Sequence, residues 1–428
     1  MTRYACDGWL HIYASETSTY VNIKLKHIET HLPYVDIALP DKWKQYIDTH
    51  ARDLLSGQRV EADDRSHAVR YYWHLASQDS WKLRKDPLES AVEFIAEHGD
   101  EHQVKLLDVQ EAPGTHVLAF EVTDVLDRWA PHTQELAMDS TFGTNGANYE
   151  LFAAVAGVEG SGIPLAFCYV QTDQNAESGA KQEVLERFLR CLKARGVNPE
   201  FVLTDKDQSE INAMGAVFPH AKHQLCFWHA LRALKQPLPK NDEQPGHYDA
   251  EYAHELFDFI DVKFVPHLVR TAAKPKNYVF CPAIHRIPIL RLFAKHANQH
   301  PFLPERHGCA RSHDDIYRDA VYEMYRHCEV NRLCEVWAYL WNNWYVPKKW
   351  KLWARAANPK SIPVHRTTMM VEALWRNVKR LVLHMYNRPP LDLTNFSIIT
   401  KSLPPLITSR EGGRPESVTH MQEAFKRS

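Results

Sequence analysis

Two aspartates end short apolar runs in the first half of the chain. Asp139 follows such a run in LAMDSTFGTN, and Asp205 ends the run in FVLTDKDQSE. Carboxylates that meet in one cleft are the ligands by which two Mg²⁺ ions hold the attacking and leaving oxygens of a phosphodiester. Aspartate is also a favoured turn residue, so each run alone fits a strand followed by a turn. Asp207, two residues after Asp205, competes with it for the role of metal ligand.

A third acid is available much later, in RTTMMVEALWRNVKRLVLHMY. Glu372, Arg376 and Lys379 share one edge of a predicted helix at i, i+4 and i+7. The stripe of apolar residues opposite them consists of Val371, Leu374, Trp375, Val378 and Leu381. A solvated Glu372–Arg376 pair is the simpler interpretation. The alternative is a helix that turns one acid toward metal ions and two cations toward phosphates.

Cysteine and histidine pairs mark two candidate metal sites. Cys226 and His229 have the spacing of half a zinc site, and His223 and the Cys281 and His285 pair are the candidates for its remaining ligands. Packing without metal fits these five residues equally well. At the N-terminus Cys6, His27 and His31 form a Cys-x20-His-x3-His pattern, which supplies three of the four ligands that tetrahedral zinc needs.

The segment around VWAYLWNNWYVPKKWKLWARA is rich in aromatic residues and lysines. Unpaired bases could stack on its aromatic rings, with the phosphates on Lys348, Lys349 and Lys351. Core packing of a helical subdomain is the simpler interpretation for most of the rings. The aromatic residues concerned are Trp337, Tyr339, Trp341, Trp344, Trp350 and Trp353.

The elements that must position the two aspartates follow from the hydrophobic pattern. ELAMDS, YELFAAVAGVE and IPLAFCYVQTD predict an antiparallel meander. SGAKQEVLERFLRCLKARG predicts a helix that stops at Gly196, EFVLTD a strand, SEINAMGAVF a helix and AKHQLCFWH a further strand. This order is that of an RNase H-like α/β core, in which the first and fourth strands are neighbours. We therefore expect Asp139 and Asp205 to lie close together.

The composition is that of an ordinary globular protein: 428 residues, 44% hydrophobic and 24% charged, with a net charge of −2. Eight scattered cysteines and an N-terminus without an apolar core favour reduced thiols and an intracellular location. No apolar run reaches the roughly 20 residues of a membrane helix. From Trp341 to Ser428, 15 Lys and Arg face 5 Asp and Glu, which favours contact with a polyanion.

Four stretches, taken in their order along the chain, resemble the DDE catalytic domain of Mutator-like element (MULE) transposases. They are LAMDSTFGTN, FVLTDKDQSEINAM, FPHAKHQLCFWHALRALK and TTMMVEALWRNVKR. The resemblance covers roughly residues 135–385. It implies an RNase H-like, retroviral integrase-type mixed sheet with a large helical insertion. It also implies that Asp139, Asp205 and Glu372 hold two Mg²⁺ or Mn²⁺ ions, and that Cys226 and His229 form the family's Cys-x-x-His motif.

The resemblance also implies partners and a layout for the chain. We expect double-stranded DNA, both transposon terminal repeats and target, as substrate, a nuclear homo-oligomer, and no membrane contact. Cys6, His27 and His31 resemble the back half of a zinc finger found upstream of such domains, whose front cysteine would precede Met1, so we expect a truncated start. No cysteine follows Cys334, so we do not expect the Cys/His-rich finger that often follows the family's catalytic domain. A catalytically silent DNA-binding protein derived from a transposon is the rival hypothesis.

The expected domains are a partial zinc-finger-like module at 1–40, a helical connector at 41–130, the first part of the core at 131–236, a helical insertion at 237–360, the catalytic helix at 361–395 and a basic tail at 396–428.

Overall fold

The computed structural model describes residues 9–14, 21–26, 45, 78–79, 81–158, 160–240, 247–266, 278–303, 311–358, 360–365, 367–386 and 388–404. By its internal contacts the chain divides into two units, Met1–Ser80 and Trp81–Ser428. In the first unit β1 (Trp9–Ala14) and β2 (Val21–Lys26) form an antiparallel pair. Cys6, His27 and His31 lie outside the described residues, so the zinc-finger-like module stays a prediction.

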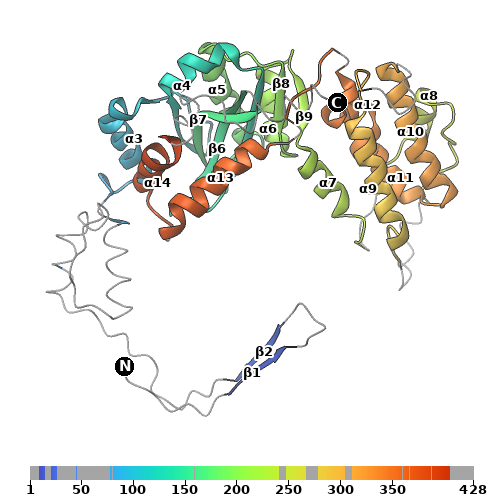
Figure 1. Ribbon diagram of the computed structural model, residues 1–428, viewed down its shortest axis with the longest axis horizontal. Coiled ribbons are helices and arrows are strands. Elements are labelled where there is room, and N and C mark those ends of the chain that lie inside the picture. Colours follow the sequence, from blue (N-terminus) through green and yellow to red (C-terminus); the bar gives the residue numbers. More distant parts are fainter. Residues whose placement is uncertain are drawn as a thin grey trace, which may run out of the picture. The chain divides into compact units, whose positions relative to one another are not determined.

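The second unit is built on one mixed sheet of seven strands in the order β3-β4-β7-β6-β5-β8-β9 (Figure 1). Neighbouring strands from β3 to β5 pair antiparallel, whereas β5, β8 and β9 run parallel. The class is therefore α/β, as predicted. The strands are β3 (Val104–Leu106), β4 (Thr115–Val122), β5 (Glu135–Thr141), β6 (Glu150–Val158), β7 (Ser161–Thr172), β8 (Phe201–Thr204) and β9 (Lys222–Leu225).

Burial on both faces explains why the central strands are nearly continuous apolar runs. Leu136, Ala137 and Met138 in β5 have no exposed surface. The first and fourth predicted strands, β5 and β8, are parallel neighbours, with Leu136 opposite Val202. This adjacency was expected from the order of the elements along the chain.

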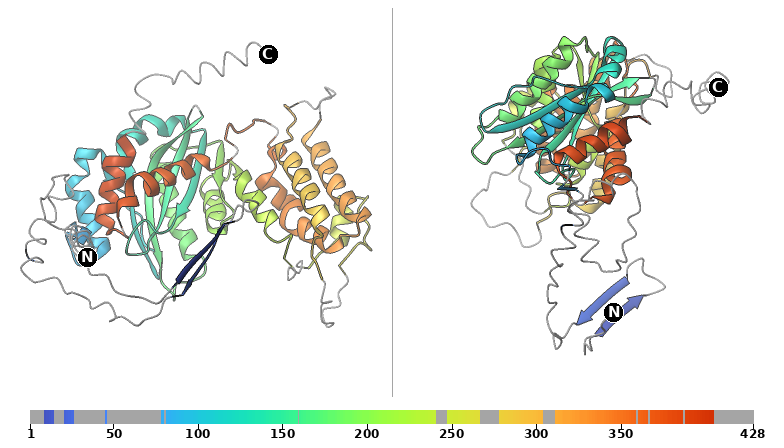
Figure 2. Two further views of the ribbon diagram at one scale, coloured as in Figure 1. Left: turned by 60° about the horizontal axis from the view of Figure 1, so that its bottom comes forward. Right: turned by 90° about the vertical axis from the view of Figure 1, so that its left-hand side faces the viewer.

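Helices cover the sheet, and Figure 1 shows α13 on one side of the strands and α4 and α5 on the other. The helices around the sheet are α4 (Thr123–Trp129), α5 (Ala180–Ala194), α6 (Gln208–Val217) and α13 (Met369–Arg376), which continues as a π-helical turn over Asn377–Val382. In Figure 2 α13 crosses the sheet. A Cβ atom on Gly162 of β7 would come within 2.5 Å of the Cβ of Met370, so this glycine allows α13 to approach closely.

The expected helical connector is wrong in its second half. Helix α3 (Pro87–His98) forms as predicted and ends at Gly99, but β3 and β4 follow it. Strand β4 pairs with β7 from Thr115 to Glu121, so its conformation depends on a partner strand some fifty residues later. A local pattern does not contain that information.

The expected basic tail is wrong at its start. Helix α14 (Leu391–Ser397) and the π-helical turn Ile398–Ser402 continue the folded unit, and Ile398 and Leu403 are buried in its core. The reason is the contact of α14 with α3, which buries one helix against the other. Residues 405–428 lie outside the described residues.

Among the described residues, helices and the loops between them form the insertion between β9 and α13, which has its own hydrophobic core. Its helices are α7 (Phe227–Lys235), α8 (Ala250–Leu256), α9 (Ala283–Asn298), α10 (His313–Val330), α11 (Cys334–Leu340) and α12 (Pro347–Trp353). All six aromatic residues singled out in the sequence are buried in this core. They pack the insertion and cannot stack on bases without unfolding it. No helix among the described residues is long and apolar enough to cross a membrane.

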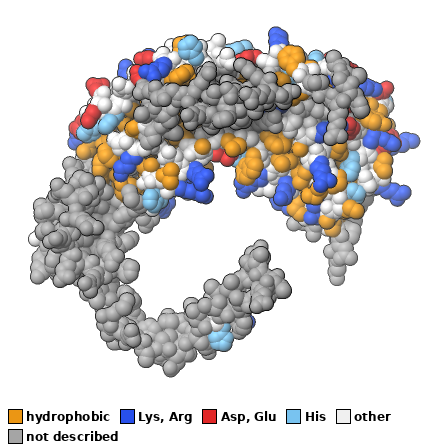
Figure 3. All heavy atoms as spheres, in the orientation of Figure 1, with side chains coloured by type: hydrophobic (Ala, Val, Ile, Leu, Met, Phe, Trp, Pro, Cys, Tyr) orange, Lys and Arg blue, Asp and Glu red, His pale blue; other side chains and the backbone are white. Residues whose placement is uncertain are grey.

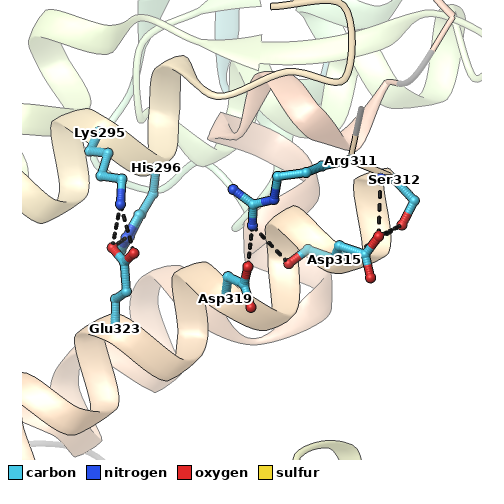
Figure 4. A network of polar contacts seen from close by, with 7 residues as sticks. All are labelled: Lys295, His296, Arg311, Ser312, Asp315, Asp319 and Glu323. Atoms are coloured by element: carbon cyan, nitrogen blue, oxygen red, sulfur yellow. Dashed lines mark hydrogen bonds and ion pairs between the residues drawn. The ribbon is translucent and has the colours of Figure 1, made fainter. Parts of the chain in front are cut away.

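Polar contacts fix α10 at two points (Figure 4). Glu323 accepts from Lys295 Nζ at 2.6 Å and contacts His296 Nε2 at 3.1 Å, which joins α10 to α9. At the start of α10 Ser312 and Asp315 form a capping box, since each side chain accepts from the other's backbone N–H. These contacts stabilise the framework of the insertion and carry no candidate chemistry.

The insertion contacts the edge of the sheet. Strand β9 packs against α12, and the Gln224 amide donates to the Trp353 carbonyl at 2.7 Å. The Lys206 ammonium, just after β8, lies 4.5 Å from the centre of the buried Trp344 ring. The loop that carries Asp205 is therefore attached to the insertion through its next residue.

Candidate catalytic and metal-binding site

Asp139 lies in β5, and Asp205 is the first residue after β8, the parallel neighbour of β5. The register sets Glu135 opposite Phe201, and four residues further along each strand are 135 + 4 = 139 and 201 + 4 = 205. Neighbouring strands lie about 4.8 Å apart. Both carboxylates therefore stand at the same edge of the sheet, as the sequence predicted.

Their closeness appears in the electrostatics of Asp139, which is 8% exposed. Burial, and next the charge of Asp205, raise the pKa of Asp139 to about 7, while His229 acts in the opposite direction. Glu372 also contributes to the upward shift. Asp205 and Glu372 thus both act on Asp139, although the three acids come from β5, the end of β8 and α13.

Asp207 has other partners. Its carboxylate caps α6 by accepting from the Ser209 and Glu210 N–H groups, and Lys181 Nζ lies 2.9 Å from its second oxygen. Burial opposes ionisation, but Lys181 outweighs it and lowers the pKa of Asp207. Asp205 accepts from the Asp207 N–H at 2.6 Å, which shapes the turn. Of the two rivals, Asp205 is the one that faces Asp139.

Glu210 is a fourth acid at this edge, and the sequence analysis missed it. It is 1% exposed, and its Oε2 has no hydrogen-bond partner among the described residues. Burial, followed by Asp205 and Asp139, raises the pKa of Glu210 well above its usual range. The signal in the sequence was an acid on the apolar face of α6, at i, i+3 and i+7 with Ala213 and Val217.

Lys181 and Glu150 complete the surroundings of the acids. Lys181 Nζ lies 3.6 Å from Glu150, which also accepts from the Ser140 hydroxyl at 2.5 Å. This network joins the end of β5, the start of β6 and the beginning of α5 and α6. It holds the turn around Asp205 in place.

Glu372 lies with Cys226 and His229. One ligand atom from each of these three side chains lies within 4.8 Å of the other two, and in the described ranges no other group of three His, Cys, Asp or Glu residues meets this condition. His229 Nε2 is 3.8 Å from Glu372 Oε1, and Glu372 makes this contact in place of the expected pair with Arg376. The three residues could hold a metal ion.

The other expected partners of Cys226 and His229 are wrong. His223 Nε2 lies 2.9 Å from the Thr204 hydroxyl, within the sheet. Cys281 is buried in the insertion core, and the His285 ring faces His327 at 5.6 Å. Sequence spacing did not reveal Glu372 as the third residue, because α13 reaches this point only through the tertiary fold.

The cations of the predicted DNA-binding set differ in exposure. Arg376 is exposed, whereas Lys379 is half-buried, and burial lowers its pKa against the opposing charge of Asp139. Leu381, expected in the apolar stripe, is exposed because the helix widens to a π-turn after Arg376.

The predicted DNA-binding lysines of α12 also differ: Lys348 and Lys351 are exposed, and Lys349 is half-buried. In Figure 3 several Lys and Arg side chains lie along the lower edge of the described surface.

Trp228 is a further exposed residue that the sequence analysis passed over. It follows the buried Cys226 by two residues and is 50% exposed. Its ring lies 5.0 Å from that of His229 and 5.4 Å from the Arg232 guanidinium. An open aromatic face with a cation beside it can stack on a nucleic-acid base.

Residues 135–233 match the family model of the MULE transposase domain. The resemblance predicted from the sequence is therefore confirmed over the segment that holds Asp139, Asp205, Cys226 and His229. Glu372 lies outside the matched range.

The chain is also similar to the mating-type protein ALPHA3 of the yeast Kluyveromyces lactis. The two are 20% identical over 426 residues, which cover 85% of this chain and 44% of that protein. The chain thus spans less than half the length of this relative. Among solved structures it is similar to the Drosophila P element transposase strand transfer complex. The two chains are 9% identical, the match covers 85% of this chain and 92% of that chain, and the TM-score is 0.28. A score of this size does not establish a common fold.

Proposed function

We propose that this chain is a DDE-type DNA transposase, which cleaves phosphodiesters at transposon ends and transfers the resulting strands. The observation that carries the proposal is the pair of carboxylates in β5 and directly after its parallel neighbour β8, where burial and next the charge of Asp205 raise the pKa of Asp139 to about 7. The strand order β7-β6-β5-β8-β9 supports an RNase H-like core, because it contains the predicted meander and sets the first and fourth predicted strands side by side. The MULE transposase domain supports the reaction class.

The acids suit hard divalent cations. Asp139, Asp205 and Glu372 offer carboxylate oxygens, the ligands that Mg²⁺ and Mn²⁺ prefer. Among the described residues, buried Glu210 Oε2 and Glu372 Oε1 have no hydrogen-bond partner, and a cation would compensate such atoms. We therefore assign Asp139, Asp205 and Glu372 as the residues that would hold two Mg²⁺ or Mn²⁺ ions.

When bound, such ions favour attack by water or a DNA 3′-hydroxyl on the phosphodiester. The protein's own residues hold the other components in place. Lys181 binds the carboxylates of Asp207 and Glu150. Of the two aspartates in the turn after β8, only Asp205 is then left to face Asp139. Arg376, with Lys348, Lys349 and Lys351, would bind backbone phosphates without reading sequence. Half-buried Lys379, beside Asp139, would contact only a phosphate that enters the site.

Mn²⁺ binding and plasmid nicking test the proposal. We would titrate the purified full chain with Mn²⁺ by electron paramagnetic resonance and incubate it with supercoiled plasmid in the same buffer. Asp139→Asn and Asp205→Asn should lose both Mn²⁺ binding and nicking. Asp100→Asn, at an exposed acid outside the site, is the matched control and should behave like the wild type. Nicking that persists in both site variants would refute the assignment.

A catalytically silent DNA-binding protein is the second candidate. One specific observation favours it: Glu372 lies with Cys226 and His229 and not in a compact group with the two aspartates. The relative from Kluyveromyces lactis is called a mating-type protein, which is compatible with a role other than transposition. Wild-type protein that binds DNA but neither binds Mn²⁺ nor nicks plasmid would support this second function.

Action in the nucleus and assembly into a homo-oligomer follow from the proposed function, because a transposase must meet chromosomal DNA and bring two ends together. Expression of a fluorescent fusion tests the first. Light scattering of the purified chain with and without double-stranded DNA tests the second. A monomer on DNA would contradict the assembly.

A further inference from the structure

Cys226, His229 and Glu372 bring a sulfur, a nitrogen and an oxygen donor together at one point. Their ligand atoms lie within 4.8 Å of one another, and His229 Nε2 is 3.8 Å from Glu372 Oε1. Cys226 and His229 belong to the junction of β9 and α7, whereas Glu372 comes from α13, more than 140 residues later. The site therefore exists only in the folded chain.

The start of α7 explains the first two positions. Cys226 is the N-cap residue of α7 and is completely buried, and its backbone N–H donates to the Thr204 carbonyl at 2.8 Å, so the sheet fixes it. His229 follows at i+3, which puts both side chains on the same face of the first turn. The Cys226 thiol interacts with the His229 ring and with the Thr368 hydroxyl, so its surroundings are polar although it is buried.

The Thr368 hydroxyl and the His229 ring interact with the Cys226 thiol at this point. Glu372 Oε1 is buried beside them and has no hydrogen-bond partner among the described residues. Thr368 is completely buried at the N-cap of α13, yet its hydroxyl does not cap that helix. A buried carboxylate oxygen without a hydrogen-bond partner is destabilising, so Glu372 Oε1 beside a thiol and an imidazole indicates that a ligand completes the site.

We propose that Cys226, His229 and Glu372 bind a thiophilic divalent cation of the Zn²⁺ class, and that this ion withdraws Glu372 from the carboxylate pair Asp139 and Asp205. A Cys, His and carboxylate set with a fourth position open to water suits Zn²⁺, whereas Mg²⁺ prefers oxygen ligands alone. Ligand atoms around tetrahedral Zn²⁺ lie roughly 3–4 Å apart, so the side chains need to move by about 1 Å. Binding itself is independent of the proposed function, and only the competition for Glu372 rests on it.

Co²⁺ is the probe for binding, because a thiolate ligand gives it a charge-transfer absorption in the near ultraviolet. The reference protein is the full chain with Cys6→Ser, since Cys6, His27 and His31 are a second candidate set for the same metal. We expect the reference to show the thiolate band on addition of Co²⁺ and to lose it when one equivalent of Zn²⁺ is added. A reference protein without the band would overturn the proposal.

Single substitutions in the reference protein assign the ligands. Cys226→Ser should abolish the thiolate band, and Cys191→Ser, at a half-buried cysteine of α5, is the matched control that should keep it. Glu372→Gln should keep the thiolate band but weaken Co²⁺ binding. This second variant tests whether the carboxylate is a ligand, even if Cys226→Ser fails to fold. A band that survives Cys226→Ser in folded protein, or Co²⁺ affinity unchanged by Glu372→Gln, would contradict the site.

Competition for Glu372 is tested separately, by adding Zn²⁺ to the Mn²⁺-supported plasmid nicking reaction. We expect nicking to be lost and to return when the Zn²⁺ is chelated and Mn²⁺ is resupplied. Nicking unaffected by Zn²⁺ at concentrations that displace Co²⁺ would refute the competition. Absence of nicking without any Zn²⁺ would refute the proposed function instead, and the Co²⁺ spectra would still decide whether the site binds metal.

Discussion

The Lys181 ammonium lies 2.9 Å from the Asp207 carboxylate, and this contact separates the roles of Asp207 and Asp205. Asp207 is held by Lys181 and by the N-terminus of α6, so its oxygens are already used. Asp205 is left to face Asp139 across the two parallel strands. A lysine on α5 thus decides which of two nearby aspartates belongs to the candidate site.

Removing this lysine tests its role in the fold. Lys181→Met leaves Glu150 and Asp207 without their cation, so we expect the free energy of unfolding to fall by about 1–2 kcal/mol, as for hydrogen bonds to charged groups in partly buried positions. Urea denaturation of the metal-free protein measures the change. Arg190→Met removes an exposed pair with Glu186 on the same helix and should cost less than about 0.5 kcal/mol. Equal losses in the two variants would contradict the special role of Lys181.

The raised pKa of Asp139 predicts how stability depends on pH. The ordinary pKa of this group is 3.8 and the folded value is about 7, so between these values the folded protein binds more protons than the unfolded chain. The contribution of Asp139 to stability is therefore present at low pH and lost as the pH rises toward 7. In metal-free protein at about pH 8, Asp139→Asn should be more stable than the wild type by on the order of 1–2 kcal/mol.

Denaturation at about pH 4 and pH 8 measures this effect, and Mn²⁺ should stabilise the wild type but not Asp139→Asn. Asp100→Asn serves again as the control at an exposed acid. An Asp139→Asn variant that is less stable than the wild type at high pH would show that the surroundings of Asp139 do not raise its pKa.

Glu135 holds the segment that returns from the insertion to α13. It is buried in β5, and its carboxylate accepts from the backbone N–H groups of Val364 and His365 and contacts the His365 ring. Glu135→Gln replaces a charged acceptor with an amide whose NH₂ faces these donors. We expect a loss of about 2–3 kcal/mol in the free energy of unfolding, measured by urea denaturation. Glu177→Gln, at an exposed position, should change it by less than about 0.5 kcal/mol.

The same contact has its own pH dependence. The Glu135 carboxylate raises the pKa of His365 above its ordinary 6.5, against the opposing effect of burial. The stabilisation is thus complete below about pH 6.5 and is lost as the pH rises through the folded value. The difference between the wild type and His365→Ala should therefore be larger at about pH 6 than at pH 9. An unchanged difference would mean that His365 is neutral in the folded protein.

Two tryptophans should separate packing from DNA contact. Trp337 has no exposed surface in the insertion core, so Trp337→Ala should cost about 3–5 kcal/mol. Half-exposed Trp228 should cost little when replaced by alanine but should weaken binding of single-stranded DNA by about 1–3 kcal/mol. Thermal unfolding and fluorescence anisotropy with a labelled oligonucleotide measure the two effects. Tyr252→Ala, at another exposed aromatic residue, is the control, and equal losses of affinity would exclude a specific contact by Trp228.

Much of the core was predictable from the sequence because its signals are local. The strands around Asp139 and Asp205 are apolar runs bounded by turns, and the helices between them show regular spacing of apolar residues. Segments whose structure depends on distant partners were not predictable in this way. Strand β4, which pairs with β7, was mistaken for part of a helical connector, and the start of the expected tail folds against α3.

The kinds of groups available for chemistry can be read from the sequence: two aspartates that end apolar runs, a Cys-x-x-His pair and a late glutamate. Which of these groups meet depends on the folded structure. Asp207 is occupied by Lys181, Glu210 turns inward toward the aspartates, and Glu372 lies with Cys226 and His229. The physical reason is that residue spacing limits neighbours to one helical turn or one strand pair, whereas these contacts join elements that only sheet pairing and helix packing bring together.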